Sequence, residues 1–352
     1  MRSFSIDKSS DAYKAIVLFV KCLIIAIIPF VFNYCFVSDI NSYTRIMLDE
    51  MHKDGYIDVL FLGASHTYRS YDVGMIEEET GLNVFNAGTS AQLMQGSYYL
   101  LKEVSKTNGV GTVYLDVTYV MQSFKKADKT QTYIIADYLK DRRIKWDYLY
   151  DAFGIDGIIN GIFPFLHGYT ADYKTLKEHI KGTYKNNSYE YVTYDNEAYR
   201  GQGFVYSFEA VDEDFVFDEV TYIDPQNPIS DFSLKYLDKI ITYCRDNNIK
   251  LVLVNPPMPD ATLSLAKNFQ EYVDAINEIA VNNNLEYMDF NLAKEEFLSM
   301  ERSDYKDCGH LNGVGAGKFS ECVCKILAGK ERDSFYPTYK QKLDNNSDNT
   351  IN

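Results

Sequence analysis

Short apolar runs alternate with amphipathic stretches along most of the chain. Residues 91–106, 231–248 and 268–284 carry apolar side chains at helical spacing, and a final helix is expected after DCGHLN (307–312). The short runs are rich in β-branched residues and have the length of buried strands. They are IDVLFLG (57–63), LNVFNAG (82–88), TVYLDVTYV (112–120), KLVLVNPP (250–257) and LEYMDF (285–290). This alternation predicts an α/β domain with a mainly parallel sheet.

The alternation fails between residues 121 and 228, which are rich in Tyr, Asp, Lys and Asn. The segment contains the apolar stretch GIINGIFPFLHGY (157–169) and a hairpin-like run at 204–211. We interpret 121–228 as an insertion after the third strand, either overhanging a binding site or serving as a structural cap. Residues 331–352 lack apolar periodicity and are expected to form a disordered tail.

Residues 15–37 form the longest apolar run, with Lys21 as their single charge. A helix of this length crosses a hydrocarbon core of about 30 Å. A buried core helix rarely stays apolar on all its faces for so long. A cleaved signal peptide has a shorter apolar region ending in small residues, whereas this run ends in NYCFV. An uncleaved membrane anchor is therefore the favoured interpretation.

Basic residues are somewhat enriched before this run, which predicts a cytoplasmic N-terminus at 1–14 and an extracytoplasmic domain beyond the span. The polar stretch 38–56 is expected to be a stem. The α/β domain is expected to comprise 57–120 and 229–330.

The composition excludes several function classes. A formal charge of −15 argues against nucleic acid as a partner, because phosphate binding needs clustered Lys and Arg. His167 and His179 have no partners at metal-ligand spacing, and no phosphate-binding glycine loop is found, so neither a metal nor another cofactor is expected. Six cysteines are too few and too oddly spaced for a disulfide scaffold, although a pair such as Cys308 and Cys322 stays open.

Polar residues follow each expected strand. The carboxyl ends of parallel strands meet at one edge of a sheet, where ligands bind. We therefore expect these side chains to gather on one rim of the domain. They are Ser65, His66, Asn86, Gly88, Ser90, Asp116, Asn255, Asp307 and His310.

Three of these residues suit nucleophilic catalysis. A serine hydroxyl becomes a nucleophile when a base takes its proton, and His310 suits that role for Ser65. Asp307, three residues before His310, suits the acceptor that orients the imidazole. The backbone N–H groups of Ser65 and Gly88 are candidates for stabilising an oxyanion.

Each of these assignments has a structural alternative. Ser65 also suits a helix cap, Asp116 a buried acid at a strand end, and His66 a structural or substrate-facing role. Asn86, Ser90 and Asn255 are candidates for supporting or substrate-contacting roles.

Three blocks of the chain resemble the SGNH/GDSL hydrolase superfamily. They are Gly63-Ala64-Ser65, Asn86-Ala87-Gly88-Thr89-Ser90 and Asp307-Cys308-Gly309-His310. The resemblance implies a flavodoxin-like three-layer α/β/α sandwich, with Ser65 as nucleophile, His310 as base, Asp307 as its orienting acid and Gly88 as oxyanion donor. Ala64 replaces the family's usual Asp. The family's Gly-x-Asn-Asp block is missing, because Asp116-Val117-Thr118-Tyr119 follows the third strand.

The departures are similar to those of membrane-anchored relatives that handle acyl groups on cell-surface polymers, such as alginate O-acetyltransferase-like proteins and the teichoic-acid D-alanine transfer protein. By this resemblance we expect a membrane-anchored serine esterase or O-acyltransferase acting on an acylated carbohydrate or other cell-envelope polymer, alongside a membrane-bound O-acyltransferase partner. The alternative is a non-catalytic SGNH-like module that binds such a polymer or scaffolds the acyltransferase.

Overall fold

The computed structural model describes residues 11–36, 43–118, 122–166, 176–177, 180–181, 193–194, 196–218, 227–266, 268–329 and 334–343. The chain divides into two compact units. One contains residues 1–40 and 153–188, and the other contains residues 41–152 and 189–352. His167 and His179, for which the sequence predicted no metal site, lie outside the described residues.

The second unit is built on a five-stranded, wholly parallel sheet with the order β2-β1-β3-β7-β8. The strands are β1 (Ile57–Leu62), β2 (Val84–Asn86), β3 (Val110–Asp116), β7 (Lys250–Asn255) and β8 (Glu286–Asp289). Their apolar composition fits a sheet that is covered on both faces. The predicted α/β fold with a parallel sheet is confirmed.

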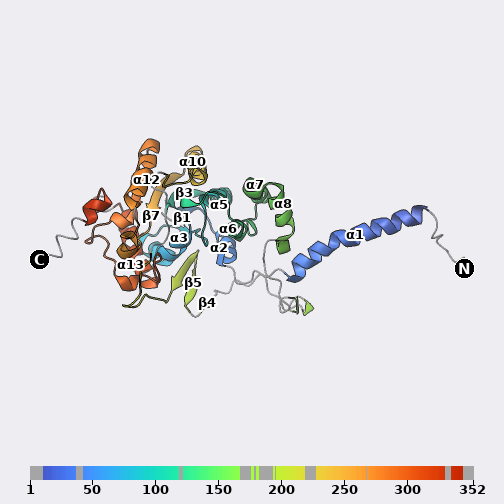
Figure 1. Ribbon diagram of the computed structural model, residues 1–352, viewed down its shortest axis with the longest axis horizontal. Coiled ribbons are helices and arrows are strands. Elements are labelled where there is room, and N and C mark those ends of the chain that lie inside the picture. The colour runs from blue at the N-terminus through green and yellow to red at the C-terminus, as the bar shows by residue number, and fades with distance from the viewer. Residues whose placement is uncertain are drawn as a thin grey trace. The chain divides into compact units, whose positions relative to one another are not determined.

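Helices cover both faces of this sheet. Strand residues such as Val59 and Phe61 pack with α4 and α13, while their alternate neighbours face the opposite layer, where α5 and α10 pack together. Figure 1 shows α10 and α12 on one side of the strands and α13 on the other. The helices are α3 (Ser65–Ser70), α4 (Val73–Thr80), α5 (Met94–Thr107), α10 (Asp231–Asp246), α11 (Asp260–Leu263), α12 (Phe269–Asn283) and α13 (Gly313–Leu327). Short 3-10 turns lie at η3 (Phe290–Leu292) and η4 (Arg302–Asp304).

The predicted insertion lies between β3 and α10 in the sequence. It contains α6 (Lys129–Ala136), α7 (Arg142–Phe153), α8 (Ile155–Ile162), η2 (Pro164–Leu166) and an antiparallel sheet of β4 (Thr193–Tyr194), β5 (Glu197–Gly201) and β6 (Phe204–Ser207). The hairpin therefore spans β5 and β6, earlier than the run expected at 204–211. The two-unit division cuts the insertion, because 153–188 falls in the first unit and the hairpin in the second.

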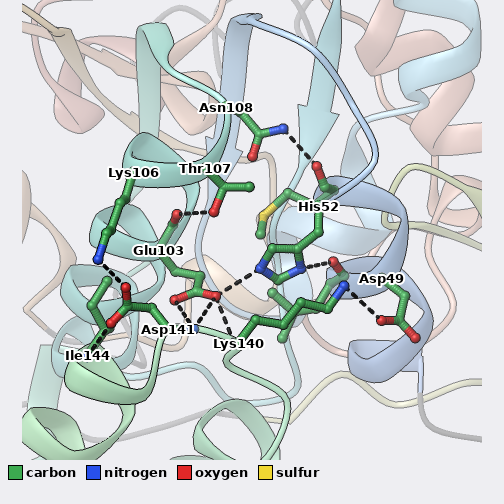
Figure 2. Close-up of polar contacts among 11 residues, drawn as sticks. Asp49, His52, Glu103, Lys106, Thr107, Asn108, Lys140, Asp141 and Ile144 are labelled. Carbon is green, nitrogen blue, oxygen red and sulfur yellow. Dashed lines mark hydrogen bonds and ion pairs between the residues drawn. The ribbon is translucent and has the colours of Figure 1, made fainter.

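The expected polar stem at 38–56 contains a helix that belongs to the domain core. In α2 (Tyr43–Met51), Ile46, Leu48 and Met51 are buried. Figure 2 shows His52, just after this helix, facing Glu103 of α5, with Nε2 2.8 Å from Glu103 Oε1. Glu103 also accepts the backbone N–H groups of Lys140 and Asp141. These contacts attach the segment to the α/β domain.

The described part of the expected disordered tail is packed. The Phe335 ring lies 5.3 Å from that of Phe290, and the Tyr339 ring lies 5.0 Å from that of Phe269. Tyr336 donates its backbone N–H to the Leu292 carbonyl. Isolated aromatic residues hold residues 334–343 on the domain without any helical or strand periodicity that the sequence would reveal.

The first unit contains α1 (Asp11–Phe36), an exposed apolar helix. Its stretch Asp11–Asn33 is, within the described residues, long and apolar enough to cross a membrane, a property shared with signal sequences. The expected span at residues 15–37 coincides with this helix.

Candidate active site

Ser65, His310 and Asp307 are connected by hydrogen bonds. Ser65 Oγ lies 2.7 Å from His310 Nε2. His310 Nδ1 lies 2.9 Å from Asp307 Oδ1 and 3.0 Å from Oδ2. The ring thus contacts a hydroxyl through one nitrogen and a carboxylate through the other, the arrangement of a serine–base–acid triad.

The turn after β1 places Ser65 at the start of α3. A Cβ atom at Gly63 would lie 2.3 Å from both Asp116 Cβ and Thr67 Oγ1, so only glycine allows the strand and helix to approach so closely. Ser65 does not cap the helix through its side chain; the preceding residue Ala64 holds the N-cap position and offers no side-chain bond. As the first residue of α3, Ser65 has a backbone N–H without an intrahelical acceptor.

A local turn preorganises Asp307 and His310. Asp307 Oδ1 accepts the backbone N–H groups of Gly309 and His310, each at 2.9 Å. Burial alone would raise the pKa of Asp307, but the hydrogen bond and charge of His310 and these two N–H groups hold that pKa well below its usual range. Asp307 therefore stays ionised and can orient the imidazole at any pH near neutrality.

The helix after this turn has its own cap. Asn312 Oδ1 accepts the N–H groups of Val314 and Gly315, both at 3.0 Å, so α13 begins at Gly313, three residues after His310. His310 is thus held between a carboxylate turn and a capped helix.

The turn after β2 lies beside α3. Gly88 is buried, and a Cβ there would lie 2.7 Å from the Tyr68 backbone nitrogen. Thr89 donates its N–H to the Gly63 carbonyl at 3.1 Å, which joins the turns after β1 and β2. The Gly88 N–H, an expected oxyanion donor, points to Asn86 Oδ1 at 3.1 Å. Asn86 is fully buried and donates Nδ2–H to the Thr67 carbonyl at 2.9 Å. Its side chain therefore links the turn after β2 to α3.

His66 is turned toward His310. The two rings stack with centroids 4.5 Å apart and planes 24° apart. His66 is buried, and neither ring nitrogen has a hydrogen-bond partner among the described residues. Burial lowers the pKa of His66 well below its ordinary value, and His310 lowers that pKa further. A neutral His66 ring therefore forms one wall against which the His310 ring lies.

Asp116 lies inside the sheet edge, as its structural alternative predicted. Its Oδ2 accepts Thr67 Oγ1–H at 2.9 Å, and its Oδ1 accepts the Thr118 N–H at 2.7 Å and the Thr118 hydroxyl. Burial raises the pKa of this carboxyl. Asp116 thereby ties α3, which carries Ser65, to the end of β3.

Asn255 lies deeper still, at the end of β7. Its side chain is fully buried and donates Nδ2–H to Asp289 Oδ2 at 3.2 Å. Asp289 also accepts the Tyr287 hydroxyl and the Asn291 backbone and side-chain N–H groups. The network joins the ends of β7 and β8. Asn255 is thus bonded to the sheet, apart from the triad's own hydrogen bonds.

A cavity of about 140 Å³ adjoins the turn after β2. It is lined mainly by apolar and aromatic side chains from α2, α6 and the β5–β6 hairpin, together with backbone of the turn. The lining residues from the turn are Gly88, Thr89 and Ser90, and Ser90 is exposed.

Sequence reasoning missed the hairpin's part in this site. Gln202, at the tip between β5 and β6, accepts the backbone N–H of Asn86 at 3.0 Å. Gly203 packs so closely that an added Cβ would lie 1.7 Å from the Asn86 carbonyl oxygen. Arg69 of α3 donates to Glu197 of β5 at 2.5 Å, a second link between the hairpin and the helix of Ser65. The glycine pair flanking Gln202 was the one signal that a tight turn lay here.

The described residues contain no group of three or more His, Cys, Asp or Glu side chains that could hold a metal ion. Cys322 donates its Sγ–H to the Phe297 carbonyl at 2.9 Å, and the pairing with Cys308 that the sequence left open is not formed.

No protein-family model matches the chain, and no curated protein matches it. Solved structures similar to it include a GDSL-like lipase from Bacteroides thetaiotaomicron VPI-5482, at 11% identity and a TM-score of 0.36, covering 83% of this chain and 99% of that one. A lipase/acylhydrolase from Enterococcus faecalis is similar at 10% identity and a TM-score of 0.31, covering 78% and 96%. A psychrotrophic esterase from Pseudoalteromonas sp. is similar at 9% identity and a TM-score of 0.36, covering 77% and 97%.

Proposed function

We propose that the chain is a serine hydrolase of SGNH type that forms an acyl-enzyme on Ser65. The observation that carries the proposal is the continuous set of hydrogen bonds from Ser65 Oγ through His310 to Asp307. His310 Nε2 takes the hydroxyl proton as Ser65 Oγ attacks an ester carbonyl, and it returns that proton to the leaving alcohol. The ionised Asp307 stabilises the imidazolium formed in between.

The oxyanion formed during attack needs donors. The Ser65 N–H is available at the start of α3, and the Gly88 N–H joins it if it turns from Asn86 Oδ1 toward substrate. The described residues after β3, Val117 and Thr118, supply no asparagine side chain as a third donor. We expect a modest rate for hydrolysis in water.

We further propose that the acyl group is short and that its donor or acceptor is a cell-envelope carbohydrate or similar polymer. The small apolar cavity beside Gly88 supports a short acyl chain. The apolar α1 helix supports an anchor in the cell membrane. The basic residues before it favour a catalytic domain outside the cell, and a membrane-bound O-acyltransferase partner is proposed by analogy with the membrane-anchored relatives. Water or a sugar hydroxyl then releases the acyl group from Ser65.

Serine-directed labelling tests the proposal. The full chain in detergent should react with a fluorophosphonate and hydrolyse p-nitrophenyl acetate, and Ser65→Ala should lose both. Ser299→Ala, at an exposed serine outside the triad, is the matched control and should retain both.

Two other results would be informative. Turnover that is unchanged in Ser65→Ala would remove Ser65 from the mechanism. A correctly folded wild-type chain that neither labels nor hydrolyses would favour the non-catalytic binding or scaffold module, for which the engagement of the Gly88 N–H by Asn86 is the supporting observation.

A further inference from the structure

The first unit has a second apolar surface besides α1. In α8 and η2, Ile155, Ile159, Ile162 and Leu166 are 71%, 43%, 39% and 46% exposed. The spacing of four and three residues puts Ile155, Ile159 and Ile162 on one side of α8, and Leu166 follows in η2. We call these four residues the α8 stripe.

The opposite side of α8 is turned inward. Gly157 and Gly161, four residues apart, are buried, so the helix buries backbone and small residues on this side while its large aliphatic side chains are exposed. A soluble helix normally has the reverse arrangement. Over residues 154–166 the only charged residue is Asp156, which lies beside the stripe and not in it. Water is therefore a poor environment for this face.

The end of α1 is in contact with the same segment. Asn33 donates its Nδ2–H to the Ile162 carbonyl at 3.0 Å. The Phe30 and Phe163 rings meet edge to face with centroids 5.9 Å apart. Both contacts come from the last two turns of α1, which ends at Phe36. Asn33 also satisfies a carbonyl at the end of α8, where helices leave acceptors unpaired.

These contacts decide what covers the stripe. If α1 spans a bilayer, its last two turns lie at the membrane–water boundary, because the helix rises only about 1.5 Å per residue. The α8 stripe is joined to those turns through the Ile162 carbonyl and the neighbouring Phe163 ring, so it lies near the same depth. We infer that α8 and η2 form an interfacial segment that inserts the α8 stripe into the lipid bilayer beside the anchor.

This insertion is driven by burial of aliphatic side chains in the lipid. It is not driven by electrostatic attraction between basic side chains and lipid headgroups. Interfacial helices that bind through electrostatics carry Lys and Arg on their polar face, and residues 154–166 have neither. The chain's charge of −15 also disfavours anionic headgroups. A zwitterionic phosphatidylcholine surface is the matching partner, and its binding should not depend on salt.

Depth-dependent quenching of tryptophan tests the inference. The full chain is placed in phosphatidylcholine nanodiscs with or without lipids brominated at carbons 6 and 7. Ile159→Trp should lose more than about half of its added emission in the brominated discs, as expected for a side chain 5–10 Å below the surface. The native Trp146 emission is measured in the wild-type chain and subtracted.

Val281→Trp is the matched control, because Val281 is an exposed aliphatic residue of α12 in the other unit. Its emission should be unchanged by bromination. Circular dichroism and intact mass check that both variants are folded and keep α1.

Ile159→Trp emission that is unaffected by bromination in an intact chain would overturn the inference. So would emission that shifts only with protein concentration, since this would identify a second copy of the chain as the occupant. The inference goes beyond the proposed catalysis and requires only that α1 lie in the bilayer. Quenching should therefore persist in a Ser65→Ala background, which separates failure of the two proposals.

Discussion

At the scale of single residues, the triad depends on a carboxylate that stays ionised. Asp307 has four interactions that favour its charge: two with the His310 ring and two with backbone N–H groups. The lowered pKa that results means that acidification toward the ordinary range of an aspartate does not protonate it. The carboxylate that contacts His310 Nδ1 thus stays charged near neutral pH.

Replacing this charge tests its role. Asp307→Asn should lower kcat for p-nitrophenyl acetate by roughly 10²–10⁴-fold while KM changes little, because the amide favours the wrong imidazole tautomer. Steady-state kinetics between pH 6 and 9 provide the measurement. Glu296→Gln removes an exposed acid eleven residues upstream and should behave as wild type. Equal kcat in Asp307→Asn and wild type would show that His310 needs no orienting acid.

The sequence predicted the triad residues because their chemistry has a local signature. Ser65 follows a strand and a glycine, and Asp307 lies three residues before His310, so spacing alone pairs acid with base. The stacking of His66 on His310 has no such signature. His66 and His310 are far apart in the sequence, and no local pattern around either residue indicates that their rings will meet.

At the scale of elements, the β5–β6 hairpin holds the second turn of the site. Gly203 has a φ of 87° and lies against the Asn86 carbonyl, so the hairpin tip fits only with glycine there. Asn86 in turn supports Gly88 and α3. An element of the insertion is therefore packed under the candidate oxyanion turn.

A methyl group at this tip should displace the hairpin. Gly203→Ala adds both left-handed backbone strain and a backbone clash, and should lower the free energy of unfolding by about 3 kcal/mol or more. Esterase activity should fall with it, because Asn86 moves. Urea unfolding and kinetics are measured beside Gly55→Ala, where an added Cβ has nothing within 4 Å. Wild-type stability in Gly203→Ala would mean that the hairpin does not rest on Asn86.

The regular helices and strands of the sheet domain could be predicted from the sequence. The packing of α2 and of residues 334–343 against that domain could not. The five strands and helices α5, α10 and α12 follow from apolar periodicity, because each buries a whole face. The polar composition of 38–56 predicts a stem, yet its short helix α2 buries Ile46, Met47 and Leu48 in the domain. Residues 334–343 attach through Phe335 and Tyr339, which are too few to give a period.

At the scale of the whole molecule, buried acids set how stability responds to pH. Burial would raise the pKa of Glu103, but hydrogen bonds from His52 and from the Lys140 and Asp141 backbone lower that pKa overall. A carboxyl with a lowered folded-state pKa adds stability above its unfolded-state pKa, near 4.3, and loses that stability as the pH falls through the folded-state value.

Glu103→Gln should isolate this contribution. At pH 7 the variant should unfold more easily than wild type by about 1–3 kcal/mol, since the amide cannot accept all the bonds that the carboxylate accepts. The difference should shrink as the pH falls below about 4, where the wild-type carboxyl becomes neutral as well. Urea unfolding at several pH values measures it, with exposed Glu78→Gln as control. A difference that stays constant with pH would exclude the ionised carboxylate as its source.

The bond between Ser65 and His310 joins positions 245 residues apart in the sequence. A ribosome makes Ser65 early and His310 near the end, and non-local contacts of this kind form late in folding. In the proposed mechanism, Ser65 therefore lacks its base during most of synthesis. A chain that is truncated or stalled before residue 310 would contain the proposed nucleophile without the group proposed to activate it.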